Sequence, residues 1–167
     1  MPADLEVIDI PSAELHVTSS LAHTDLYVRV SDVAPSGTIT HVSDALRRLA
    51  ADQPIDGMVE VELAPVAHRF QRGHRIRVQV ASAAYPRWDR NLGTGEPPAT
   101  ASAMRAADQQ VHHAPHRPSV LVERARVTRS TPSTARSSRR RSRLVTIWQP
   151  GSALSSSRTC WGSRDVA

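Results

Sequence analysis

The feature that most constrains the fold of this chain is a set of short segments in which apolar and polar residues alternate. HRIRVQV at 74–80 places Val78 and Val80 on one side of an extended chain. Arg75 and Arg77 lie on the other side, which we expect to form a polar outer face. Because successive side chains of a strand point to opposite faces of a sheet, this period of two predicts strands with one buried face. The same alternation occurs in ELHV at 14–17, DLYVRVSDV at 25–33, MVEVEL at 58–63 and SVLV at 119–122.

Turn residues separate these segments. APSG at 34–37 and NLGTG at 91–95 combine residues that favour tight turns. Gly73 precedes the segment at 74–80, and glycine adopts the positive φ values that a sharp entry into a strand requires. Many short strands joined by turns predict an antiparallel β-sandwich or jelly roll, so we predict a mainly β fold.

One stretch of the sequence fits a helix better than a strand. SDALRRLAAD at 43–52 begins with Ser43 and Asp44, and both residue types are suited to cap a helix N-terminus. Leu46 and Leu49 would then share one helical face. Because the stretch is short, we expect a helix of at most about two turns here.

The net charge of +5 at pH 7 is distributed unevenly along the chain. Residues 1–123 contain 11 arginines against 15 aspartates and glutamates, a net of −4, whereas residues 124–167 contain 10 arginines against one aspartate, a net of +9. The second segment shows neither alternation nor a clear apolar helical face. We therefore predict a partial β-sandwich domain at 1–123 and a disordered Arg/Ser-rich tail at 124–167. The abrupt change in composition is consistent with an out-of-frame reading of the tail.

Composition also limits the class of protein. Cys160 is the only cysteine, so the chain cannot form an internal disulfide. No apolar run approaches the roughly 18 residues that a membrane span needs. The N-terminus lacks the basic start and apolar middle of a secretory signal. We therefore expect a cytoplasmic protein that does not contact a membrane.

The longest distinctive segment, FQRGHRIRVQVASAAYPRWDRNLGTG at 70–95, resembles part of a known family of domains. It is similar to the C-terminal domain of the X-Pro dipeptidyl-peptidase and cocaine esterase group of serine hydrolases, the CocE/NonD group. Further similar segments follow the order found in that family and extend the resemblance over about residues 3–122. They are DLEV at 4–7, TSSLAHTDLYVRVSDVAPSG at 18–37, VEVELAPVAHRF at 59–70 and VHHAPHRPSVLV at 111–122.

The resemblance implies a jelly-roll, galactose-binding-like β-sandwich that packs against an α/β-hydrolase catalytic domain. In such enzymes the hydrolase domain supplies the catalytic serine, aspartate and histidine, and the whole enzymes cleave ester or amide bonds, among them X-Pro dipeptides at peptide N-termini. On this comparison the sequence lacks the catalytic domain and the first strands of the sandwich, and it contains no G-x-S-x-G nucleophile elbow. We therefore expect an accessory domain that is inactive alone, whose partner is the catalytic domain. We assign no catalytic, cofactor-binding or metal-binding residue and expect no cofactor.

Two other functions remain as alternatives. Tyr85 and Trp88 offer large amphipathic rings beside the turn at 91–95, as an independent carbohydrate-binding module would require. RSSRRRSR at 136–143 is able to neutralise phosphates, as in a nucleic-acid binder, although no aromatic residue is interleaved with it. We also expect that open sheet edges favour self-association.

Three histidines in VHHAPH resemble a metal cluster. His112, His113 and His116 lie close in sequence, but Pro115 interrupts their spacing and no cysteine or acidic residue is adjacent. We expect them to lie in a loop or at a domain contact.

The residue types of a hydrolytic triad occur together near the second alternating segment. Ser19, Ser20, His23 and Asp25 all lie within seven residues. Because triad partners converge from separate elements of a fold, this spacing favours a polar turn before a strand.

Overall fold

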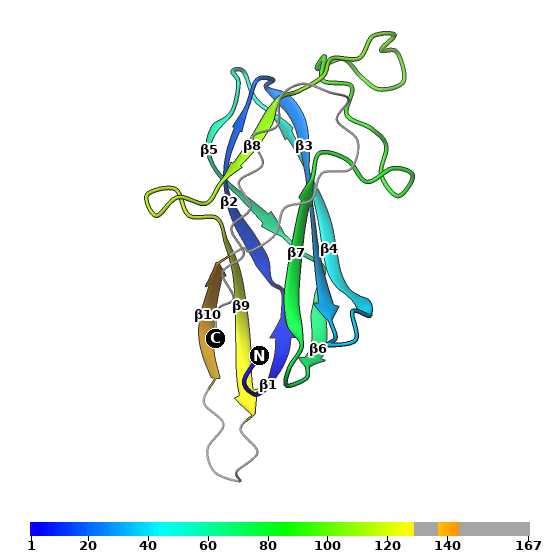
Figure 1. Cartoon of the computed structure of the whole chain (residues 1–167). Coiled ribbons are helices and arrows are strands. Elements are labelled where there is room, and N and C mark those ends of the chain that lie inside the picture. Colours follow the sequence, from blue (N-terminus) through cyan, green and yellow to red (C-terminus); the bar gives the residue numbers. More distant parts are fainter. Residues whose placement is uncertain (129–136, 144–167) are drawn as a thin grey trace.

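The computed structural model describes residues 1–128 and 137–143, and within these ranges every regular element is a β-strand (Figure 1). No helix in this part of the chain is long and apolar enough to cross a membrane. The strands are β1 (Asp4–Asp9), β2 (Ser12–Ser19), β3 (His23–Val33), β4 (Ile39–Ala50), β5 (Asp56–Glu62), β6 (Val66–Phe70), β7 (Arg75–Ala81), β8 (Gln109–His112), β9 (Val120–Thr128) and β10 (Ser137–Arg143). The mainly β fold class is confirmed.

The larger sheet has the strand order β5-β2-β9-β1-β6, with β8 paired to β2 and β10 paired to β9, all antiparallel. β1 and β2 are consecutive parts of one extended line, and β6 and β5 run beside them in the opposite direction. The line breaks at Pro11, which has no N–H to donate to a ladder. The Pro11 carbonyl instead accepts a hydrogen bond from the Leu63 N–H at 2.8 Å, so the two long strands stay joined across the break.

The smaller sheet has the order β4-β3-β7 and packs face to face with the larger one (Figure 1). Its central strand, β3, pairs antiparallel with both neighbours. A β-bulge between Val30 and Ser31 shifts the β3–β4 register, so that Val30 lies opposite Ser43 while Ser31 lies opposite His41. Bulges twist a strand locally and re-aim its side chains, and this one lies beside the polar cluster described below.

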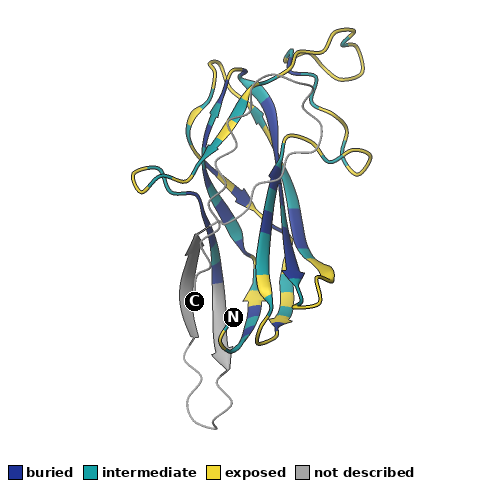
Figure 2. Cartoon of the chain, in the orientation of Figure 1, coloured by how far each residue is buried: buried dark blue, intermediate teal, exposed yellow. Residues whose placement is uncertain are grey.

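The core lies between the two sheets and is built from the apolar residues of the alternating segments. Each Val or Leu fully buried there contributes roughly 1.5–3 kcal/mol relative to exposure. Figure 2 shows the exposed residues concentrated in the loops and at the strand ends. The core residues are Leu5, Val7, Ala13, Leu15, Val17, Leu26, Val28, Val30, Val59, Val61, Leu63, Phe70, Val78, Val80 and Leu121. The predicted inward faces of the alternating segments are thereby confirmed.

The predicted helix at 43–52 is wrong. Residues Ile39–Ala50 form β4, which pairs with β3 along its length. Helix propensity is a weak preference, and a neighbouring strand that offers a full ladder of backbone hydrogen bonds outweighs it. Ser43 and Asp44, which we expected to cap a helix, are instead buried polar residues of a strand.

Part of the segment that was predicted to be a disordered tail has regular structure. β9 continues to Thr128, and β10 pairs with it from Arg143 opposite Val120 to Ser137 opposite Arg126. The arginine-rich run at 137–143 is therefore a strand of the larger sheet. The rest of the predicted tail, and Arg136 of the arginine-rich motif, lie outside the described residues.

Candidate functional site

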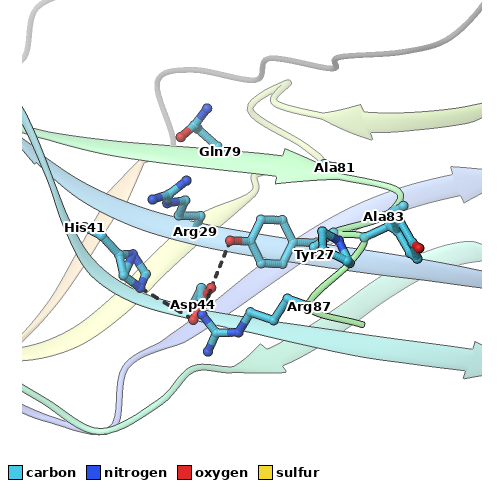
Figure 3. A pocket seen from close by; sticks show the side chains of 11 residues that line it. Tyr27, Arg29, His41, Asp44, Gln79, Ala81, Ala83 and Arg87 are labelled. Carbon is cyan, nitrogen blue, oxygen red and sulfur yellow. Dashed lines mark hydrogen bonds and ion pairs between the residues drawn. The ribbon is translucent and has the colours of Figure 1, made fainter. Parts of the chain in front are cut away.

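The outer face of the smaller sheet carries a cluster of polar side chains. Arg29 on β3 lies directly opposite Asp44 on β4 and Gln79 on β7. Tyr27 points to the same side, because it is two residues from Arg29 on the same strand. Directly opposed side chains in antiparallel strands have Cβ atoms about 4.5–5.5 Å apart, so the register brings these groups into contact range. The loop at 82–97, which follows β7, folds back over this face and adds Arg87 (Figure 3).

Asp44 is the centre of this cluster. Its side chain is only 4% exposed, yet it is a carboxylate on the outer face of a sheet. It accepts a hydrogen bond from the Tyr27 hydroxyl at 2.9 Å and another from Arg87 Nη1 at 2.8 Å. His41 Nε2 lies 3.6 Å from the second carboxylate oxygen. A buried carboxylate is tolerated only when partners compensate its charge, and these three groups do so.

Tyr27 is held as a neutral hydrogen-bond donor. Burial, and then the hydrogen bond to Asp44, raise the pKa of Tyr27 to about 12. Burial disfavours the charged phenolate, and ionisation would also remove the proton donated to Asp44 and place a second negative charge beside that carboxylate. The phenol therefore acts as a structural donor at neutral pH and is unsuited to be a base or a nucleophile.

A pocket of ≈ 360 Å³ opens over this cluster. Arg29 and Gln79 form part of its polar floor (Figure 3). Tyr85 and Pro86 belong to its apolar lining. Ala81, Ala83 and Ala84 complete the apolar lining. The floor contains one unsatisfied group, because the buried Nε of Arg29 has no hydrogen-bond partner among the described residues.

The two aromatic residues proposed as a carbohydrate platform have different environments. Tyr85 is 64% exposed at the rim of the pocket, follows β7 in the loop and precedes a cis peptide bond to Pro86. Trp88 is half-buried, because its ring packs on Tyr27 with centroids 5.6 Å apart and the Arg87 guanidinium lies 4.5 Å above it. Trp88 therefore fixes the loop to the sheet, and only Tyr85 presents most of its ring to solvent.

Asp25, one of the four residues that resembled a triad, clamps the same loop at its far end. It is 1% exposed and accepts two hydrogen bonds from Arg48, at 3.0 and 2.9 Å. Asn91 Nδ2 donates a third at 2.8 Å, and Arg48 also donates to the Asp89 carbonyl at 2.7 Å. The carboxylate thus joins β3, β4 and the loop. These contacts are structural.

The other three triad-like residues contact different parts of the chain. Ser19 Oγ accepts a hydrogen bond from the Leu21 N–H at 3.2 Å within the turn after β2. Ser20 Oγ accepts one from the Asp108 N–H at 2.9 Å, and His23 lies against Gly95, where an added Cβ would come within 2.7 Å of the ring. The structure therefore gives each of these residues its own partner and does not bring them together as a triad.

The three histidines at 112–116 are spread along the end of β8 and the loop after it. His112 Nε2 and the Thr18 hydroxyl are 2.6 Å apart, and the His112 carbonyl accepts a hydrogen bond from Ser119 at 2.7 Å. His113 and His116 are exposed. No group of three His, Cys, Asp or Glu residues in the described ranges has the arrangement of a metal site.

A second buried polar cluster gave no signal in the sequence. Asp32 on β3, 6% exposed, lies 3.0 Å from His68 Nε2 and 2.9 Å from His74 Nδ1. These histidines come from β6 and from the turn before β7, 36 and 42 residues away. The cluster ties the two sheets together near one end of the sandwich.

The fold and the outer-face cluster together define an antiparallel β-sandwich domain whose ionisable groups are mainly engaged in structural contacts. The family model of the X-Pro dipeptidyl-peptidase C-terminal non-catalytic domain matches residues 1–122, and the chain belongs to this family. The resemblance inferred from the sequence motifs is confirmed.

The similar proteins are several times longer than this chain. A cocaine esterase from Rhodococcus sp. (strain MB1 Bresler) is 31% identical over 130 residues, which cover 71% of this chain and 23% of the esterase. The crystal structure of an aminopeptidase from a marine sediment Thaumarchaeota archaeon matches with a TM-score of 0.63 and 27% identity, over 75% of this chain and 24% of that chain. An α-amino acid ester hydrolase structure matches with a TM-score of 0.63 and 28% identity, over 72% of this chain and 23% of the other. The chain thus spans about a quarter of each of these proteins.

Proposed function

We propose that this chain is the accessory β-sandwich domain of a CocE/NonD-type serine hydrolase, either an X-Pro dipeptidyl-peptidase or an acyl esterase, and that it has no hydrolytic activity alone. One observation carries the proposal: a family of non-catalytic domains matches residues 1–122, and the segments of similar hydrolases that match this chain make up only about a quarter of those proteins. The partner of this domain is then an α/β-hydrolase catalytic domain, which supplies the nucleophile.

The chemistry of the described residues supports an accessory role. The best-positioned carboxylates, Asp25 and Asp44, are each bound by several donors. Tyr27 is kept protonated by burial and by Asp44. A general base must be free to take a proton from a substrate, and a carboxylate that already holds an arginine in place is poorly suited to that role.

The anchored loop at 82–97 also supports a docking role. Its two halves are fixed to the smaller sheet, by Arg87 on Asp44 and by Asn91 on Asp25. A loop that is fixed in this way loses little conformational entropy when another domain binds against it. Tyr85 and the apolar residues beside it provide contact area at low entropic cost.

A chimera tests the proposal. In the Rhodococcus cocaine esterase, the segment that matches this chain is replaced by the matching residues of this chain. We expect the isolated chain to show no turnover of aryl esters or X-Pro chromogenic dipeptides above buffer, and the chimera to regain activity that the esterase loses when the segment is deleted.

Two results would contradict the proposal. One is turnover by the isolated chain that persists after repeated purification and is absent from a mock preparation. The other is a chimera that is soluble and cooperatively folded but no more active than the deletion variant.

A further inference from the structure

We propose that the pocket on the outer face of β4-β3-β7 binds a small carboxylate-bearing molecule with a short apolar body, and that Arg29 holds the carboxylate. This site is independent of the hydrolase proposal, because it uses only groups of this chain. It lies on the side of the smaller sheet that faces away from the core (Figure 3).

The unsatisfied guanidinium is the first reason. The Nε of Arg29 is buried and has no hydrogen-bond partner among the described residues. An unpaired buried donor is destabilising and uncommon in native proteins. Because this donor belongs to a residue that lines the pocket, it indicates that a polar group is to be bound there.

Charge is the second reason. Asp44 lies opposite Arg29 in the strand register, but its carboxylate already accepts from Tyr27 and Arg87 and lies near His41. The guanidinium groups of Arg29 and Arg87 against the one carboxylate of Asp44 leave a net charge of +1 among these three groups. An anion therefore completes the cluster. The planar fork of an arginine fits a carboxylate with two parallel hydrogen bonds.

The shape and lining of the pocket select the class of anion. Its ≈ 360 Å³ lies at the small end of the range of ligand sites in proteins. The Gln79 amide lies opposite Arg29 in the register and offers a second donor to the same oxygen atoms. Pro86, Tyr85 and three alanines supply the apolar part of the lining. A bare phosphate would leave this apolar lining exposed to water, whereas a carboxylate with a short aliphatic body would bury it.

The experiment uses the full chain and a pair of probes that differ only in charge. N-acetyl-leucine carries a free carboxylate, and N-acetyl-leucinamide is its neutral equivalent. Titrations are followed by the Nε–H signal of Arg29 in ¹H–¹⁵N spectra, which is identified by its absence in Arg29→Gln. We expect the acid to shift this signal with a Kd of about 1 mM and the amide to bind at least about tenfold more weakly.

Variants locate the site. Arg29→Gln should weaken binding of N-acetyl-leucine at least about tenfold. Arg47→Gln removes an exposed arginine from the same sheet outside the pocket and should leave binding unchanged. If Arg29→Gln does not fold, Arg29→Lys takes its place, because lysine keeps the charge without the fork and should bind more weakly than the native chain. Gln79→Ala should also weaken binding.

Three outcomes would overturn the proposal. The first is equal binding of the acid and the amide. The second is native-like binding of the acid by both folded Arg29 variants. The third is the absence of any shift of the Arg29 signal at about 50 mM acid.

Discussion

The outer faces of the two sheets derive from the same alternating pattern but have different structures. On the smaller sheet, Asp25 and Asp44 point away from the core and are nevertheless 1% and 5% exposed, because the loop at 82–97 covers them and donates to both. On the larger sheet, Ile8 and Met58 also point away from the core and are 71% and 61% exposed. The polar network on the smaller sheet is therefore buried because a loop covers it, and the alternation along the strands does not determine this burial.

The two faces should also differ in how much their charged groups contribute to stability. On the smaller sheet an ion pair such as Asp25–Arg48 has one fully buried partner, so the loss of the other partner leaves an uncompensated buried charge. On the larger sheet the Asp4–Arg69 pair has both partners in contact with water. Exposed pairs are weak, because water and salt screen them and long side chains must be ordered.

The largest expected effect comes from Arg48→Ala. The buried Asp25 carboxylate then loses its counter-charge and the two hydrogen bonds from Arg48, so the free energy of unfolding should fall by about 3 kcal/mol. Urea denaturation measures this change. The matched control on the larger sheet, Glu60→Ala, replaces an exposed strand residue and should change stability by less than about 0.5 kcal/mol. Similar losses in the two variants would show that the faces are energetically equivalent.

A glycine of the loop at 82–97 and a glycine of an open turn differ in how closely they are packed. Gly93 has φ of +73°, and an added Cβ would lie 2.7 Å from the Arg105 carbonyl oxygen and 2.9 Å from Leu21 Cδ1. Gly37 has φ of +88°, but nothing lies within 4 Å of its added Cβ. Gly93→Ala should therefore lower the free energy of unfolding by about 2 kcal/mol and Gly37→Ala by about 1 kcal/mol, since only the first adds a collision to the backbone strain. Thermal unfolding measures both changes. A larger loss for Gly37→Ala would contradict tight packing of Gly93 against Arg105 and Leu21.

Tyr27→Phe removes one hydrogen bond beneath the loop and should lower the free energy of unfolding by about 1 kcal/mol at neutral pH. The folded pKa of Tyr27, about 12, lies above the ordinary value of 10.0. The stabilisation linked to this shift is therefore complete below pH 10 and is lost as the pH rises through 12. Absorbance at alkaline pH should show a tyrosinate transition near 12 that Tyr27→Phe lacks. An identical alkaline titration of the two proteins would contradict the burial of this hydroxyl.

The smallest effect is expected at the exposed pair of the larger sheet. The hydrogen bond from Arg69, followed by that from the Arg72 N–H, lowers the pKa of Asp4 below 3.8. A lowered folded pKa stabilises the fold above the unfolded pKa, and this contribution is lost as the pH falls through the folded value. Asp4→Asn should therefore lower Tm slightly near neutral pH, by less than Tyr27→Phe, and the difference should vanish at about pH 2. A difference in Tm that is independent of pH would show that the pair does not act through charge.

The inner faces of the strands were predictable, whereas the polar cluster was not. Val78 and Val80 were placed correctly because alternation is a property of neighbouring residues along one strand. Asp44 was misread as a helix cap, since its role depends on lying opposite Arg29 in a partner strand. That register depends in turn on the bulge at Val30/Ser31, which no local sequence pattern predicted.

The sequence by itself determined the class of fold, the residues that face the core, the glycines of the turns and the family. These features are local in the chain or are carried by motifs of fixed order. Only the tertiary structure decided which outward-facing charges are buried and which side chain each one meets. Asp25 and Asn91 are 66 residues apart, and their contact exists only because strand pairing, a bulge and a folded-back loop bring them together. Charged and hydrogen-bonding groups interact through space, so their partners are determined by the three-dimensional fold and not by distance along the sequence.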